Sequence, residues 1–260
     1  MTGSQVAQRF FVDGRWLEAA RIEARQSDLP TIVMLHEGLG SVAHWKDFPL
    51  RLAEETGAEV FLYSRYGHGA SDALGEPRPV TYMHHEAQVV LPEILGKAGI
   101  ERPLLVGHSD GASIALIYAG TFPDAPRGLV LEAPHVLVEE ITRSSIAQAR
   151  GLYQTTDLPE RLRKYHANGD AVFWGWNNIW LDPGFQDWNI EAFLDSVRCP
   201  VLVIQGADDE YGTFQQIEAI RRKIPSTTAL VLDKCKHAPH RDRPDAVLSA
   251  IVQAVRSAPV

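Results

Sequence analysis

The sequence predicts an α/β fold in which a mostly parallel, doubly wound sheet carries an inserted helical segment. Short runs of consecutive apolar residues recur along the chain, and such runs are typical of strands that helices cover on both faces. Stretches with apolar residues at helical spacing separate these runs, and this alternation indicates a parallel sheet. The composition, 45% hydrophobic and 22% charged in 260 residues, is that of an ordinary globular protein and excludes a largely disordered chain.

The first predicted element is a hairpin over residues 9–24, because Asp13-Gly14 is a turn signal between two strand-like segments. The hairpin would add two antiparallel strands to one edge of the sheet. Six buried strands are then predicted at residues 31–36, 59–64, 103–107, 128–132, 201–205 and 228–232. The connecting and terminal helices are predicted at residues 48–56, 82–97, 112–122, 214–223 and 244–256.

The alternation of predicted strands and helices stops between the fourth and fifth buried strands, where a long stretch contains no convincing strand. We interpret it as four short helices, one of which starts at a capping box made by Asp157 and Glu160. Four of the six tryptophans lie here, Trp174, Trp176, Trp180 and Trp188. The predicted organisation is one α/β core domain, residues 1–134 and 198–260, with a helical cap at residues 135–197.

Charge and hydropathy limit the partners that we expect. With 33 acidic and 25 basic residues the formal net charge is -8, and the basic residues are scattered, so neither a nucleic acid nor a membrane is expected as a partner. No apolar run approaches the ~20 residues needed to cross a bilayer, and the first residues do not resemble a secretory signal. Two cysteines cannot form a disulfide framework. We therefore expect a cytoplasmic protein that acts on a small molecule, with a homodimer left open.

The segment that indicates chemistry is Gly107-His108-Ser109-Asp110-Gly111, which lies between a predicted strand and a predicted helix. A turn this sharp strains its central residue and requires small neighbours, which the Gly-x-Ser-x-Gly pattern supplies. The Ser109 hydroxyl would then stand clear of the backbone at the carboxyl edge of the sheet. The first N–H groups of the following helix would face negative charge that develops there.

A serine hydroxyl needs a base within hydrogen-bond reach, and that base needs a carboxylate to orient it. Acidic candidates follow the fifth buried strand, and histidine candidates follow the sixth. They are Asp208, Asp209 and Glu210, and His237 and His240. The chain order serine, then acid, then histidine is that of one known class of triad enzymes.

With these motifs the chain resembles the α/β-hydrolase superfamily, in the capped branch that contains esterases, lactonases, C–C hydrolases and dehalogenases. The resemblance covers nearly the whole chain. Its motifs are an oxyanion loop in TIVMLHEGLGS, a glycine-rich loop in YSRYGHGAS, the nucleophile turn in LLVGHSDG, the acid loop in VLVIQGADDEYG and the histidine loop in CKHAPHRDRP. A serine at position 109 distinguishes the chain from dehalogenases, which have aspartate there.

The resemblance implies a role for individual residues. The spacing from Gly206 selects Asp209 as the triad acid, and the following Ala238-Pro239 selects His237 as the base. The backbone N–H groups of Gly38 and Asp110 are the implied oxyanion donors, with Leu39 as the alternative for the first. Two residues depart from the family pattern, since Glu37 replaces a usual glycine and Ser64 a frequent aspartate.

We therefore predict a serine hydrolase that cleaves a carboxylic ester or lactone of a small molecule through Ser109, His237 and Asp209, without a metal or organic cofactor. Glu37, His108, Trp176 and Trp180 are predicted to line its pocket. One alternative is a C–C bond hydrolase of ring-cleavage products, which would need a pocket arginine that the sequence does not single out. The other is a ligand-binding protein on the same fold with little turnover.

Overall fold

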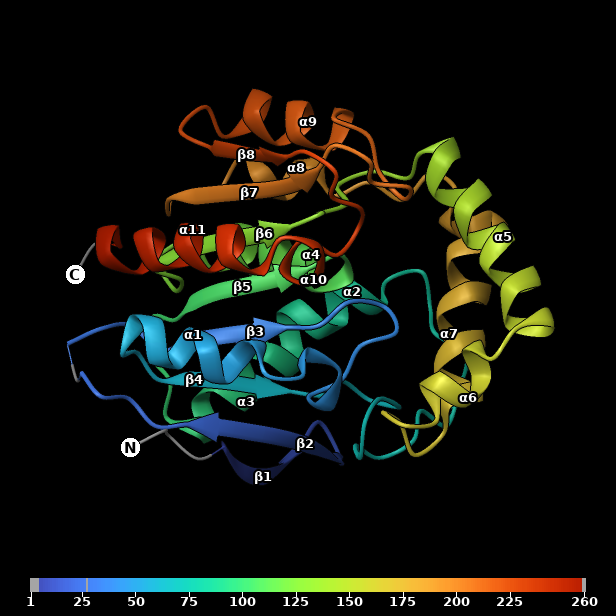
Figure 1. Ribbon diagram of the computed structural model, residues 1–260, viewed down its shortest axis with the longest axis horizontal. Helices are drawn as coiled ribbons and strands as arrows, with labels where there is room; N and C mark the ends of the chain where they lie inside the picture. The colour runs from blue at the N-terminus through green and yellow to red at the C-terminus, as the bar shows by residue number, and fades with distance from the viewer. Residues whose placement is uncertain (1–4, 27, 259–260) are drawn as a thin grey trace.

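The computed structural model describes residues 5–26 and 28–258, which form a single eight-stranded sheet with helices on both faces (Figure 1). The strand order is β1-β2-β4-β3-β5-β6-β7-β8, and the predicted α/β fold is confirmed. The strands are β1 (Gln5–Val12), β2 (Arg15–Ile22), β3 (Ile32–Leu35), β4 (Val60–Tyr63), β5 (Leu104–His108), β6 (Gly128–Glu132), β7 (Val201–Gly206) and β8 (Thr228–Leu232).

The first two strands form the predicted hairpin at one edge of the sheet. Asp13 and Gly14 make its turn with φ angles of 45° and 78°, and β2 pairs antiparallel with both β1 and β4. All other pairs are parallel. Parallel strands bring their carboxyl ends to the same edge, so the loops that follow β3, β5, β7 and β8 meet there.

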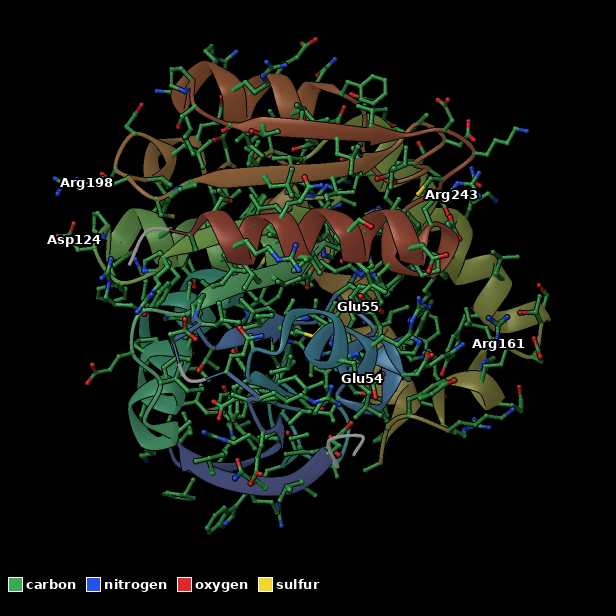
Figure 2. All side chains as sticks on the ribbon, turned by 60° about the vertical axis from the view of Figure 1, so that its left-hand side comes forward. Glu54, Glu55, Asp124, Arg161, Arg198 and Arg243 are labelled. Atoms are coloured by element: carbon green, nitrogen blue, oxygen red, sulfur yellow. The ribbon has the colours of Figure 1, made fainter. Side chains whose placement is uncertain are left out.

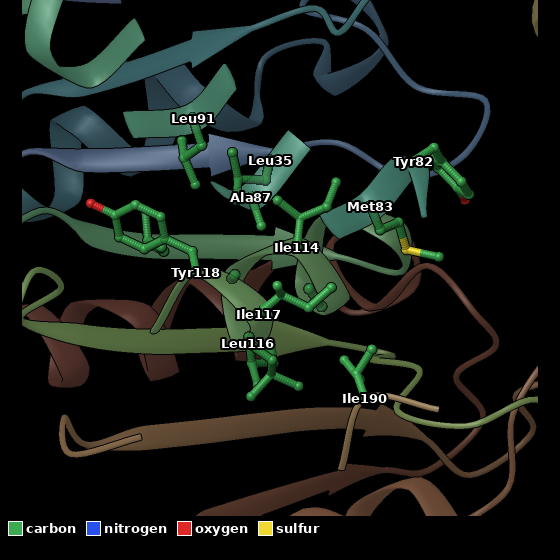
Figure 3. Packing of buried hydrophobic residues seen from close by; sticks show 14 of the residues in the cluster. Leu35, Tyr82, Met83, Ala87, Leu91, Ile114, Leu116, Ile117, Tyr118 and Ile190 are labelled. Carbon is green, nitrogen blue, oxygen red and sulfur yellow. The ribbon is translucent and has the colours of Figure 1, made fainter. Parts of the chain in front are cut away.

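Alternate residues of the central strands supply two separate apolar cores, one on each face of the sheet. In β3, Val33 and Leu35 belong to one core, and Ile32 and Met34 belong to the other. The first core is packed by α3 (Leu91–Ala98), α4 (Asp110–Thr121) and α9 (Gln215–Lys223), and Figure 3 shows Leu91, Ile114 and Ile117 within it. The second core is packed by α1 (Phe48–Thr56) and α11 (Pro244–Ser257). Burial on both faces explains why these strands read as continuous apolar runs.

The long segment between β6 and β7 is helical. Its elements are α5 (Glu140–Thr155), α6 (Leu158–Leu162), α7 (Gly169–Leu181), the 3-10 helix η3 (Pro183–Phe185) and α8 (Glu191–Leu194). Helices α5, α6 and α7 lie together beyond the carboxyl ends of the strands (Figure 1), whereas α8 packs against α4 and α9. The short elements elsewhere are η1 (Ala43–Trp45), α2 (Tyr82–His85), the π-helix η2 (Glu86–Val90) and α10 (Pro239–Asp242).

The predicted capping box at Asp157 is wrong, although a helix does begin there. Asp157 has φ −78° and ψ 11°, not the extended backbone of a capping residue, and its side chain makes no cap hydrogen bond. The hydroxyl of Thr156 instead accepts from Leu158 N at 3.3 Å. Across the described residues, no helix combines the length and the apolar character that a membrane crossing requires.

Candidate active site

Ser109 occupies a strained turn between β5 and α4. Its φ of 53° and ψ of −116° fall outside the regions that residues with a side chain normally adopt. A Cβ atom at Gly107 would lie 2.5 Å from the carbonyl oxygen of Gly111, and one at Gly111 would lie 2.1 Å from that of Leu35. The two glycines are therefore required by the close approach of α4 to β3 and β5.

The structure brings Ser109, His237 and Asp209 together at the carboxyl edge of the sheet. His237 Nε2 lies 3.0 Å from Ser109 Oγ, and His237 Nδ1 lies 2.8 Å from Asp209 Oδ1. The three residues follow β5, β8 and β7, so parallel strands account for their meeting from distant parts of the chain.

Asp209, and not its neighbour Asp208, faces the histidine. The Asp209 carboxylate also accepts from Tyr211 N at 2.8 Å and from Gln205 Nε2 at 2.5 Å, whereas Asp208 is exposed. Burial alone would raise the pKa of Asp209, but the charge of His237 and these hydrogen bonds outweigh it and hold the pKa below its ordinary value. The carboxylate is therefore ionised at neutral pH and fixes Nδ1 of His237 as a donor.

His237 is partly buried and its pKa is raised from the ordinary value. Burial lowers this pKa, while the charge and hydrogen bond of Asp209, followed by the charges of Glu210 and Glu37, raise it further than burial lowers it. His108 Nε2 lies 2.7 Å from the carbonyl oxygen of His237 and contacts the loop, not the ring nitrogens.

The other histidine of the loop, His240, has a different partner. Its Nδ1 lies 3.0 Å from Glu132 Oε2, and both residues are buried. Glu132 also accepts from His240 N at 2.8 Å. This pair anchors the start of α10, and the ring of His240 therefore binds Glu132 and not Ser109.

Two backbone N–H groups remain available beside Ser109. Neither Gly38 nor Asp110 donates its N–H to another group of the described residues, and the first N–H of a helix has no partner within that helix. The N–H of Leu39, in contrast, donates to Glu37 Oε2. Leu39 is thus already engaged, which leaves Gly38 and Asp110 as the available pair.

Glu37, the departure from the family pattern, is held inside the site by two contacts. Its Oε1 lies 3.1 Å from His44 Nδ1, and its Oε2 accepts from Leu39 N. Burial would raise the pKa of this carboxyl, but the hydrogen bond and charge of His44, with smaller contributions from His108 and Arg241, place the pKa well below its ordinary value. The carboxylate is therefore a fixed negative charge that braces the loop through the Leu39 N–H.

A cavity of about 550 Å³ opens above Ser109 and His237 and is closed on one side by α5, α6 and α7. All four predicted pocket residues, Glu37, His108, Trp176 and Trp180, line it. The indole of Trp176 lies against Gly38 so closely that a Cβ atom there would be 2.2 Å from Trp176 Cδ1. The Trp180 side chain is nearly inaccessible and packs against His135 and Phe185.

The sequence does not predict the side chains that fix the triad acid and the two proposed oxyanion donors in place. Gln205 and Tyr211 bind the Asp209 carboxylate, and Arg65 reaches Asp110 and the carbonyl of Glu37. A polar Gln205 in an otherwise apolar strand was a signal for the first. Nothing in the sequence pairs Arg65 with Asp110, since only the fold brings the loop after β4 to the start of α4.

The eight-stranded sheet and the serine turn between β5 and α4 define the class of protein as a hydrolase of the α/β type. The chain belongs to the alpha/beta hydrolase family, whose family model matches residues 32–250. The resemblance predicted from the sequence is confirmed.

Its relatives have different substrates. A proline iminopeptidase of Lactobacillus delbrueckii subsp. bulgaricus is 22% identical over 244 residues, which are 79% of this chain and 83% of the relative. The enol-lactonase from Burkholderia xenovorans matches with a TM-score of 0.75 at 18% identity, over 96% of this chain and 100% of that one. A thermophilic esterase from Thermogutta terrifontis matches with a TM-score of 0.73 at 19% identity, over 97% and 99%. At these identities the structural matches establish the fold and leave the substrate to be argued from the site.

Proposed function

We propose that this protein is a serine hydrolase that cleaves a carboxylic ester or lactone of a small molecule. The observation that carries the proposal is the continuous series of contacts from Ser109 Oγ through His237 to Asp209, at 3.0 Å and 2.8 Å. Such a series lets a weakly nucleophilic hydroxyl lose its proton as it attacks.

The proposed reaction has two halves. Ser109 Oγ bonds to the substrate carbonyl carbon while its proton passes to His237 Nε2, and the N–H groups of Gly38 and Asp110 bind the oxyanion. The imidazolium then protonates the leaving alkoxide as the ester C–O bond breaks, which leaves an acyl group on Ser109. In the second half, His237 takes a proton from water, whose oxygen bonds to the acyl carbon. Release of the carboxylic acid returns the proton to Ser109, and no step calls for a metal or organic cofactor.

We further propose that α5, α6 and α7 act as the cap of this site. They cover the cavity above Ser109, and their aromatic residues Trp176 and Trp180 form part of its wall. A lid of this kind excludes water and shapes the pocket without supplying a triad member.

A C–C bond hydrolase remains the second candidate, because Arg161 and Arg241 line the cavity. The sequence did not single out a pocket arginine, and the structure corrects this. Either residue is a candidate partner for the carboxylate of a ring-cleavage acid. A ligand-binding protein with little turnover is the third, and the triad contacts argue against it.

The test is a substrate panel assayed with wild-type protein and with Ser109→Ala as the matched control. It contains p-nitrophenyl esters of increasing chain length, a lactone, a dienoic ring-cleavage acid and a proline anilide. We expect Ser109-dependent hydrolysis of esters or the lactone. Turnover of the dienoic acid or of the anilide alone would replace the proposal, and binding without any turnover would favour the third candidate.

A further inference from the structure

Four cations stand around the mouth of the catalytic cavity, and the proposed hydrolysis makes no use of them. Lys46, Arg161, Lys164 and Arg241 line the same cavity as Ser109 and His237, and all four are exposed to solvent. We call them the rim cations. They come from the end of η1, from α6 and the turn after it, and from α10, so three separate parts of the fold converge on one opening. Figure 2 shows Arg161 at the end of the molecule opposite Arg198.

The rim is positive in a chain that is negative as a whole. The chain has 33 acidic residues against 25 basic ones, yet the cavity lining includes only two carboxylates, those of Glu37 and Asp157. Glu37 is already engaged by His44 and Leu39, and Asp157 lies 3.9 Å from Arg161. Among the described residues, Lys46, Lys164 and Arg241 have no carboxylate within 4.0 Å.

Lys46 gives a second, independent indication. Its φ of 56° and ψ of −127° fall in a region that favours glycine, and a lysine there costs of the order of 1–3 kcal/mol. The backbone turns because the Lys46 N–H closes η1 on Ala43 O. A lysine therefore occupies a position at which glycine would be more stable, and this lysine is one of the residues that line the cavity.

From these observations we infer that the natural substrate carries an anionic group, a carboxylate or a phosphate, which the rim cations bind while Ser109 attacks a carbonyl deeper in the cavity. This inference rests on the proposed function and narrows it to anionic esters or lactones. The rim would also attract such substrates before they bind, an effect that salt weakens.

The test compares two esters of equal chain length, p-nitrophenyl pentanoate and mono-p-nitrophenyl glutarate, at low and high ionic strength. We expect kcat/KM for the anionic ester to exceed that for the neutral one, and the ratio to fall as salt rises. Inorganic phosphate and glutarate, used as competitive inhibitors, separate the two anion chemistries. Loss of one exposed charge should lower the ratio of the two kcat/KM values by about two- to fivefold. We expect a decrease of this size in each of Arg161→Gln, Lys164→Gln and Arg241→Gln.

Two variants make the result specific. Lys46→Gly should raise the melting temperature, because it relieves backbone strain, and still lower the anionic preference. Arg198→Gln removes an exposed charge that pairs with Asp124 at the opposite end of the molecule and should leave the ratio unchanged. Equal turnover of both esters, unaffected by the rim variants, would overturn this inference alone, whereas failure to hydrolyse either ester would count against the proposed function.

A second inference rests on buried contacts behind the site. Arg65 Nη2 donates to the carbonyl oxygen of Glu37 at 2.8 Å, and Arg65 Nη1 donates to Asp110 Oδ2 at 3.3 Å. Both charged groups are almost fully buried, and Tyr82 OH donates to the same Asp110 oxygen at 2.7 Å. One guanidinium thus joins the loop after β3 to the start of α4.

Each of the two Arg65 contacts lies next to one of the proposed oxyanion donors. The carbonyl of Glu37 and the N–H of Gly38 belong to one planar peptide group, so fixing the oxygen fixes the direction of the N–H. The side chain of Asp110 anchors the residue whose own N–H is the second donor. The geometry assigns Arg65 as a positioning residue that fixes the orientation of both proposed oxyanion donors.

The test separates positioning from stability. In Arg65→Lys the ammonium keeps a charge beside Asp110 but cannot make the two separate contacts of a guanidinium. We therefore expect a melting temperature close to that of the wild type, a kcat about 10- to 100-fold below wild type, and little change in KM. The affinity for a trifluoromethyl ketone, which forms a tetrahedral adduct with serine, should fall in parallel with kcat/KM.

Two further variants complete the design. Arg65→Met with Asp110→Asn removes both buried charges together, which avoids leaving an unpaired carboxylate, and should also show low kcat. Arg21→Met is the matched control, since Arg21 binds Glu59 and the carbonyl of Ala98 away from the site and its loss should lower stability without lowering kcat. Normal kcat in Arg65→Lys or in the double variant would overturn the assignment.

Discussion

Replacing Asp209 by asparagine should abolish most of the activity, whereas the same change at Asp208 should not. In the structure Asp209 accepts on both oxygens, from His237 Nδ1 and Tyr211 N on one side and from Gln205 Nε2 on the other. An asparagine offers one acceptor, so its amide must turn donors either toward His237 or toward Gln205. The variant loses the charge that stabilises the imidazolium and weakens control of the tautomer.

The magnitude follows from the loss of one buried, charge-assisted contact at 2.8 Å. In serine protease triads this loss lowers kcat by about 10⁴, or about 5.5 kcal/mol at 1.36 kcal/mol per factor of ten. Steady-state kinetics on the best ester of the panel, with melting temperatures of both variants, measures it. Asp208→Asn should change kcat less than twofold because the Asp208 side chain is exposed. Equal losses in the two variants would refute the assignment of the acid.

Three other predictions follow from the site. Activity should rise with pH as His237 loses its proton, because His237 must be neutral to act as a base, and the midpoint should lie above the ordinary histidine pKa of 6.5 since the pKa of His237 is raised. Glu37→Gln removes one of the charges that raise this pKa and should move the rise in kcat/KM to lower pH. Gly38→Ala should lower kcat, since the new Cβ would lie 2.2 Å from Trp176, and crystallography or the tetrahedral inhibitor would show the displaced loop; normal kcat would mean that the loop yields freely. Trp176→Ala and Trp180→Ala should shift the preference between short and long acyl groups by about 10- to 200-fold, measured on the ester panel; a uniform loss with a lower melting temperature would make both residues packing groups only.

The sheet and the approximate places of the central strands could be predicted because buried parallel strands leave an apolar signature that survives in the sequence. The serine turn could be predicted because its glycines are required by backbone contacts shorter than a Cβ allows. The choice between Asp208 and Asp209 depended on the family spacing and not on the physics of either side chain.

Other features depend on contacts between distant segments and leave no local pattern. The Arg65–Asp110 pair joins the loop after β4 to the start of α4, and the rim cations converge from three parts of the fold. Glu37 was recognised as a departure, but only the structure shows that His44 and the Leu39 N–H hold its carboxylate. The start of α6 was predicted correctly for the wrong reason, since Thr156 and not Asp157 satisfies its first N–H.

The most direct test of the central claim, that Ser109 is the nucleophile, is covalent labelling with a fluorophosphonate followed by peptide mass spectrometry. The account predicts one label per chain, on the peptide that contains Ser109, and loss of activity in proportion to labelling. Label should be absent from Ser109→Ala and slow in a variant that lacks His237. Label on Ser71 or Ser113, or full ester hydrolysis by Ser109→Ala, would contradict it.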